Sequence, residues 1–242
     1  MEAIKIEKLT KRYKDALAVD SLSLSIEEGE LFSLLGVNGA GKTTTIKMLS
    51  CLTSATDGDA YLLGKSIRRE ANEVKSLIAV SPQESAIAKA LSVRENLSLI
   101  CGVHGFSKEK SEKKIEELTE LLDLGEVIGR KAGKLSGGFQ RRLSIAMALI
   151  CEPKILFLDE PTLGLDVIAR SELWDVIRAL KGKVTIILTT HYMQEAEALS
   201  DRIAIMKDGK LLVCDTADKI KEKAETDNFE EAFVRFVRGV TK

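Results

Sequence analysis

The sequence contains no long run of apolar residues. Its longest apolar stretches, such as residues 146–151, are far shorter than the roughly 20 residues that a membrane-spanning helix needs. Residues 1–8 mix charged and apolar side chains and lack the apolar block of a secretory signal. We therefore expect a soluble chain located in the cytosol.

Closely spaced cysteines, a basic excess and low-complexity tracts are absent as well. The four cysteines, Cys51, Cys101, Cys151 and Cys214, are widely separated and form no Cys-x-x-Cys motif, which argues against a metal site or a disulfide framework. Reduced and mostly buried thiols are expected instead. The formal net charge of -1 disfavours a nucleic-acid partner held mainly through its phosphates.

The pattern of apolar residues predicts a single α/β unit. At 242 residues and 45% hydrophobic composition, the chain can bury one large core, or a core with a subdomain. Alternation at residues 3–7 and 22–26 predicts two antiparallel strands. Residues 30–35, 155–158 and 184–190 predict buried strands of a sheet whose strands are joined by helices, the first of them at residues 44–52.

The middle and the end of the chain have a different character. Helical patterns at residues 97–100, 108–122 and 139–150 predict a mostly helical insertion over residues 84–150. Asp208 and Gly209 predict a tight hairpin between strands at 203–206 and 210–214. Apolar residues from Phe229 to Val240 predict a terminal amphipathic helix that packs on the body of the protein.

Residues 36–43 match the pattern of a phosphate-binding loop between a strand and a helix. Gly39 and Gly41 can adopt positive φ, which lets backbone N–H groups close on phosphate oxygens. Lys42 is expected to reach the β- and γ-phosphates of a nucleotide, and Thr43 to present its hydroxyl to Mg²⁺. A glycine-rich turn without a ligand is the weaker alternative. The predicted binding residues of this loop are Gly36, Val37, Asn38, Gly39, Ala40, Gly41, Lys42, Thr43 and Thr44.

Polar residues stand at the ends of two predicted strands. Asp159 and Glu160 follow residues 155–158, at the edge where a parallel sheet presents its active groups. Asp159 is expected to hold the water shell of the metal, while Glu160 orients or deprotonates the water that attacks the γ-phosphate. His191 ends the strand at 184–190 and is placed to bond the γ-phosphate or that water. An acidic helix start and a structural histidine are the alternatives.

A second element suited to anions lies between these two. Ser136, Gly137 and Gly138 open the helix predicted at 139–150, where free backbone N–H groups and the positive end of the helix dipole meet. The chain therefore carries two phosphate-binding elements, separated by most of the predicted insertion.

These motifs resemble those of the ATP-binding cassette (ABC) ATPases, the nucleotide-hydrolysing subunits of ABC transporters, and the resemblance covers nearly the whole chain. It implies a P-loop NTPase core with a mixed central sheet and an antiparallel β subdomain at 1–83 and 151–242, and an inserted α-helical subdomain at 84–150. It also implies that Tyr13 stacks on adenine, that Gln83 contacts the metal, and that Asp166 acts across a dimer. Phe139 precedes Gln140 after the second glycine, and Leu163 stands where a serine is common; both depart from the family pattern.

The resemblance implies a mechanism that needs a second ATPase subunit, either an identical chain or a close paralogue, and a membrane partner. ATP and Mg²⁺ would lie between the phosphate loop of one subunit and Ser136 to Gly138 of another, in a head-to-tail dimer. The chain would drive a separate integral membrane permease, as do the subunits of ABC-2 efflux systems, from the inner face of the cell membrane. The alternatives are an ABC ATPase that remodels a soluble partner, such as a cluster-assembly complex, and a nucleotide-binding module with little turnover, which Glu160 and His191 disfavour.

Overall fold

The computed structural model describes residues 1–14 and 16–240, and within them the chain forms two β-sheets. The larger sheet has the strand order β10-β9-β3-β8-β7-β6 and the smaller one the order β2-β1-β4-β5. Neighbours in the larger sheet run parallel except β10, which pairs antiparallel with β9. The predicted mixed central sheet and antiparallel β subdomain are both confirmed.

The central strands of the larger sheet are buried on both faces. They are β3 (Leu31–Gly36), β7 (Ile155–Asp159) and β8 (Thr185–Thr190), and every residue in them is buried. In β7, Leu156 and Leu158 join one apolar cluster, whereas Phe157 joins the cluster on the opposite side of the sheet. This alternation is the mark of a parallel strand covered on both faces, and it explains why the sequence there is continuously apolar.

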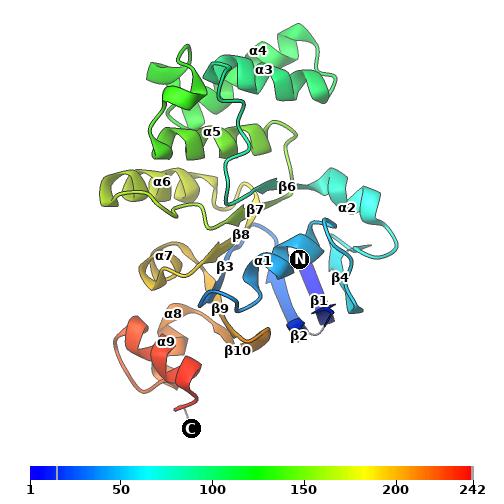
Figure 1. The fold of residues 1–242 in the computed structure, drawn as a ribbon, viewed down its shortest axis with the longest axis vertical. Helices are drawn as coiled ribbons and strands as arrows, with labels where there is room; N and C mark the ends of the chain where they lie inside the picture. The colour runs from blue at the N-terminus through cyan, green and yellow to red at the C-terminus, as the bar shows by residue number, and fades with distance from the viewer. Residues whose placement is uncertain (15, 241–242) are drawn as a thin grey trace.

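The smaller sheet forms the antiparallel layer predicted near the N-terminus. β1 (Glu2–Tyr13) pairs with β2 (Ala16–Glu27), with Ile4 opposite Ile26, and β1 also pairs with β4 (Asp57–Leu62), which continues into β5 (Lys65–Ser66). Its apolar face shares a cluster with Phe32 of β3 and Met48 of α1 (Lys42–Leu49). The first helix of the chain is therefore enclosed between the two sheets (Figure 1).

Helices gather at one end of the molecule, as predicted for the insertion. α3 (Val93–Val103), α4 (Lys108–Leu121) and α5 (Gly137–Leu149) lie together there, with the short 3₁₀ turns η1 (Gly125–Val127) and η2 (Ala132–Lys134) between α4 and α5 (Figure 1). α3 begins earlier than the apolar pattern alone predicted. The reason is a capping box, in which Ser92 and Glu95 satisfy each other's backbone N–H groups.

Several elements lie outside the residue ranges that the sequence predicted, and three of them border the central sheet. α2 (Ala71–Leu77) leads directly into β6 (Ile78–Ser81), the edge strand beside β7, and α6 (Val167–Leu180) connects β7 to β8. β6 has only four residues and offers too short a pattern to identify. α6 could have been recognised, because Asp166 caps it and Leu173, Val176, Ile177 and Leu180 are buried at helical spacing.

The C-terminal helices cover the end of the sheet face to which Leu156 and Leu158 belong. α7 (Met193–Leu199), α8 (Ala217–Lys223) and α9 (Phe229–Arg238) share an apolar cluster with β9 (Arg202–Lys207) and β10 (Lys210–Asp215). Asp208 and Gly209 both have positive φ in the turn of the predicted hairpin. The terminal helix packs on the body, as predicted.

Two expectations from composition can be compared with the fold. The prediction of reduced, mostly buried thiols holds in part: all four cysteines are free, Cys101 is buried, and the other three are partly exposed. Cys51 and Cys151 follow the ends of α1 and α5, and Cys214 lies in the edge strand β10. Over residues 1–14 and 16–240, the longest helices are either too short or too polar to cross a bilayer.

Candidate functional site

The loop between β3 and α1 has the geometry of a phosphate cradle. Gly39 and Gly41 have φ of 84° and 100°, as predicted. A Cβ on Gly36 would lie 2.5 Å from the Met206 carbonyl oxygen, and one on Gly41 would lie 2.5 Å from the Ala18 carbonyl oxygen. Only glycine fits at these two positions, because the loop turns sharply against β9 and β2. The turn leaves the first N–H groups of α1 pointing into the loop.

Lys42 occupies the centre of this loop. Its side chain is 6% exposed, and its Nζ donates to the carbonyl oxygens of Gly36 at 2.7 Å and Val37 at 3.3 Å. The same Nζ lies 3.4 Å from Oε1 of Glu160. A buried ammonium at the base of the loop is the group expected to meet phosphate oxygens there.

Asp159 lies behind the start of α1, at the end of β7. Its Oδ1 accepts hydrogen bonds from Thr43 Oγ1 at 3.1 Å and from Thr189 Oγ1 at 2.5 Å. A hydroxyl beside a carboxylate suits a hard cation such as Mg²⁺. In the described part of the chain, no three His, Cys, Asp or Glu side chains gather as a metal cage. The residues present therefore fit a metal that takes most of its ligands from phosphate and water, which is the usual habit of Mg²⁺.

Glu160 follows with an unusual backbone. Its φ of 49° is in the left-handed region, which costs of order 1 kcal/mol or more in a non-glycine residue. The backbone N–H of Glu160 is held by the carbonyl and the hydroxyl of Thr189, at 3.1 and 3.0 Å. Its carboxylate is 8% exposed, and Oε2 lies 2.5 Å from His191 Nδ1. The strained backbone thus turns this carboxylate between Lys42 and His191.

Lys42, Glu160 and His191 line one cleft of about 490 Å³. Three residues predicted for the loop and the acidic pair do not line it: Asp159, which contacts the lining residue Thr43, and Gly36 and Val37. Tyr13 lies at its margin, 44% exposed, with Lys11 Nζ 4.9 Å from the centre of its ring. Gln83, an exposed residue just after β6, lines it as well. The residues that line the cleft are Tyr13, Ala18, Asn38, Gly39, Ala40, Gly41, Lys42, Thr43, Thr44, Gln83, Glu160, Leu163 and His191. Sequence reasoning thus placed residues from five separate segments at one site.

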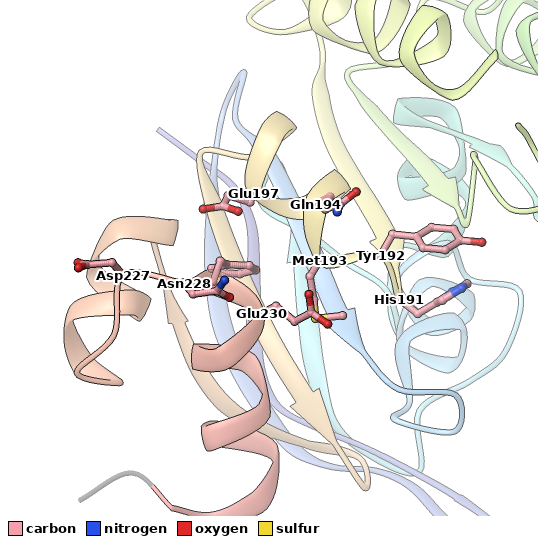
Figure 2. A pocket seen from close by; sticks show the side chains of 9 residues that line it. His191, Tyr192, Met193, Gln194, Glu197, Asp227, Asn228 and Glu230 are labelled. Carbon is pink, nitrogen blue, oxygen red and sulfur yellow. The ribbon is translucent and has the colours of Figure 1, made fainter. Parts of the chain in front are cut away.

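A second cleft of about 450 Å³ lies on the other side of His191. Figure 2 shows that the side chains of His191 and Tyr192 point away from the carboxylates of Glu197 and Asp227. Glu230 is a third carboxylate on its wall. A cleft with this charge repels a triphosphate, whereas the first cleft offers a lysine and a helix N-terminus. The phosphate site is therefore assigned to the first cleft.

Ser136, Gly137 and Gly138 do not line the cleft that contains Lys42. Ser136 is exposed and caps α5, accepting a hydrogen bond from the Phe139 N–H at 3.5 Å. A Cβ on Gly138 would lie 3.2 Å from Cβ of Ala169 in α6, and one on Gly137 would lie 3.1 Å from Leu165. The two glycines let the start of α5 pack tightly on the start of α6. The second element predicted to bind anions therefore lies outside the cleft that contains Lys42.

Two residues near the site were not predicted. The hydroxyl of Thr189 joins Asp159 to the backbone of Glu160. Arg141 of α5 donates to the backbone carbonyls of Pro82 and Gln83. Thr189 could have been suspected, because it precedes His191 at a strand end. Nothing in the sequence around Arg141 distinguishes it from the neighbouring Arg142.

A parallel sheet with a phosphate loop after one strand and an acidic pair after another defines a P-loop nucleotide hydrolase. Comparison with known proteins narrows this class. The family model described as "ABC transporter" matches residues 19–163, and the chain belongs to that family. It is an ATPase of the ABC transporters, as the resemblance implied.

Individual relatives support this assignment. The chain is 38% identical over 229 residues to "Daunorubicin resistance ATP-binding protein DrrA2" of Streptomyces coeruleorubidus, covering 94% of this chain and 71% of the relative. It is 36% identical over 245 residues to "Probable multidrug ABC transporter ATP-binding protein YbhF" of Escherichia coli, covering 99% of this chain but 42% of that relative. A solved structure described as "Structure of ATP binding subunit of ABC transporter" matches with a TM-score of 0.84 at 25% identity, over 97% of this chain and 99% of that one.

Proposed function

We propose that this chain binds Mg-ATP in the cleft around Lys42, forms a head-to-tail dimer around two nucleotides, and drives a separate membrane permease that exports its substrate. One observation carries the dimer. The chain has two elements suited to phosphate, and Ser136 to Gly138 do not line the cleft that holds the other. A second copy can supply the missing element to the open side of each cleft.

Within the cleft, each predicted residue has a distinct role. Lys42 and the N–H groups of residues 39–44 bind the phosphates. The metal would be held by side-chain oxygens of Thr43, Asp159 and Gln83. Bound Mg²⁺ would neutralise charge on the β- and γ-phosphates. Tyr13 stacks on the adenine, for which its exposed position at the margin of the cleft is suitable.

Glu160 is proposed to position and deprotonate the attacking water. Its carboxylate is buried, held by His191 on one oxygen and facing Lys42 with the other. The contact with His191 fixes the direction of the carboxylate. It also connects Glu160 to a residue that can bond the γ-phosphate. Hydrolysis then removes the charge that bound the two subunits together, so the dimer can open.

A subunit-mixing experiment tests the shared site. Lys42→Ala damages the phosphate loop, and Ser136→Arg blocks the Ser136–Gly138 element. In a head-to-tail dimer of one chain of each kind, one site carries both changes and the other site carries neither. We expect mixing of two inactive variants to restore ATP hydrolysis to a measurable fraction of the wild-type rate. If each chain binds and hydrolyses ATP without help from a second copy, the mixture stays as inactive as its components.

The partner and direction of transport are inferred from the relatives. Their names refer to daunorubicin resistance and to a multidrug transporter, which supports an exporter of the ABC-2 type. We propose that the chain associates with an integral membrane permease from the cytoplasmic face of the membrane. We also propose that residues 84–150, whose helices gather at one end in Figure 1, form the subdomain that transmits motion to this permease.

Co-purification distinguishes this proposal from its alternative. The chain with an affinity tag is isolated from detergent-solubilised membranes and from the soluble fraction of its source cells. We expect a polytopic membrane protein to accompany it, and ATP hydrolysis to respond when the two are reconstituted in vesicles. Recovery with a soluble cluster-assembly complex instead would favour the remodelling function and remove the permease from the proposal.

A further inference from the structure

Arg141 joins the start of α5 to the backbone of the nucleotide site. It is 5% exposed, and its guanidinium donates to the carbonyl oxygens of Pro82 and Gln83, both at 2.6 Å. The nitrogen that donates to Gln83, Nη2, also lies 3.4 Å from a third carbonyl oxygen, that of Glu160. One side chain therefore contacts the backbone of the proposed metal-contacting residue and that of the proposed catalytic residue.

The buried charge of Arg141 has an unusual environment. In the described part of the chain, no carboxylate lies within ion-pairing distance of the Arg141 guanidinium. The two ion pairs made nearby on α5 are those of the next residue, Arg142. Burial lowers the pKa of Arg141, while the more distant charges of Asp159 and Glu195 favour its charged form. Burying a charge against carbonyls alone is costly. Packing does not account for this free-energy cost, because an apolar side chain of similar length would fill the same space.

Arg141 also lies close to the Ser136–Gly138 element. It is in the second turn of α5, the helix that begins at Gly137 and is capped by Ser136. A planar guanidinium bonded to two successive carbonyls resists rotation in a way that a single ammonium contact does not. A shift of α5 therefore moves the backbone of residues 82–83, and the backbone near Glu160, by a similar amount.

We propose that Arg141 is a positioning residue that couples the placement of the Ser136–Gly138 element to the placement of Gln83 and Glu160. When a nucleotide draws the start of α5 towards a second copy, Arg141 brings the two backbone segments into the arrangement that permits hydrolysis. This inference rests on the proposed roles of Gln83 and Glu160. It adds a residue that contacts neither nucleotide nor metal.

Paired substitutions in neighbouring residues test it. Arg142 provides the matched control, because it is on the same helix and equally buried, but its ion pairs go to Asp123 and Glu172, both at 2.9 Å. Arg141→Met, Arg141→Lys, Arg142→Met and Arg142→Lys are compared for kcat, ATP dissociation constant, melting temperature and deuterium uptake of residues 80–90.

For Arg141→Met we expect kcat to fall on the order of 10²-fold, because small misplacements of catalytic groups have effects of this size. The ATP dissociation constant should change less than about threefold, since Arg141 does not line the cleft. Deuterium uptake at residues 80–90 should rise. Arg141→Lys should recover part of kcat, because one ammonium can satisfy one of the carbonyls. Arg142→Met should lower the melting temperature while kcat of the folded protein stays close to that of the wild type.

Three results would overturn the inference: wild-type kcat in Arg141→Met, equal loss of kcat in the Arg141 and Arg142 variants in proportion to their melting temperatures, or a parallel loss of ATP affinity. Glu160→Gln, assayed alongside, separates this outcome from failure of the proposed function. If Glu160→Gln is inactive and Arg141→Met is fully active, only the role of Arg141 is lost. If Glu160→Gln itself turns over normally, the proposed roles within the site are wrong.

Discussion

Replacing Glu160 by glutamine changes one oxygen of the site to an amide nitrogen and removes one buried charge. The carboxylate is 8% exposed, with His191 Nδ1 at 2.5 Å and Lys42 Nζ at 3.4 Å. In the variant, the amide oxygen can still face Lys42, while the NH₂ group can donate to His191 if that ring takes the opposite tautomer. The shape of the cleft is therefore kept, but the group that accepts a proton from water is gone.

The expected loss of activity follows from the role of a general base. Such groups contribute about 10²–10⁴-fold to the rate, so kcat should fall by at least about 10²-fold, or roughly 2.7 kcal/mol of activation free energy. Lys42 keeps its bonds to Gly36 and Val37, and the stability of the fold should drop by only about 1–3 kcal/mol. That corresponds to a melting temperature lowered by about 2–12 °C in a chain of this size.

Steady-state release of phosphate measures kcat, and titration with a fluorescent ATP analogue measures affinity. We expect affinity close to the wild-type value and a dimer by sedimentation in the presence of Mg-ATP, because binding is retained while hydrolysis is blocked. Glu197→Gln provides the control, since it makes the same chemical change on α7 at a carboxylate that is 39% exposed and paired with Lys221. Hydrolysis by Glu160→Gln at the rate of this control would refute the assigned role.

Three further changes have defined outcomes. Lys42→Ala should raise the ATP dissociation constant by about tenfold or more, since a charge-assisted contact is worth about 1.5–3 kcal/mol; unchanged affinity in the same titration would contradict the loop assignment. Gly41→Ala should lower the free energy of unfolding by more than about 1 kcal/mol, because φ is 100° and the new Cβ would meet the Ala18 carbonyl oxygen; chemical denaturation measures this. Burial raises the pKa of Glu195, so the folded chain holds this proton more tightly than the unfolded chain, and the resulting stability is lost as pH rises above the unfolded value of about 4.3. Glu195→Gln should therefore raise the melting temperature more at pH 8 than at pH 5, and an equal difference at both would argue against a perturbed carboxyl.

Much of the site could be read from short segments, because local geometry sets it. A glycine-rich loop between a strand and a helix places N–H groups on an anion wherever it occurs, and Gly39, Gly41 and Lys42 adopt the expected arrangement. Strand ends likewise present polar groups at one edge of a parallel sheet, which brought Asp159 and His191 near the loop. Each of these inferences depends on neighbours a few residues apart.

Other features depend on contacts between distant parts of the chain. The order β3-β8-β7 sets Thr189 beside Asp159 and His191 beside Glu160, across separations of 30 and 31 residues. Arg141 reaches Gln83 across 58 residues, and only packing of α5 distinguishes it from Arg142. The placement of Ser136 outside the cleft follows from the contact of Gly138 with α6. Local patterns specify which groups a chain offers, whereas strand order and helix packing, set by burial of the whole core, determine which of them meet.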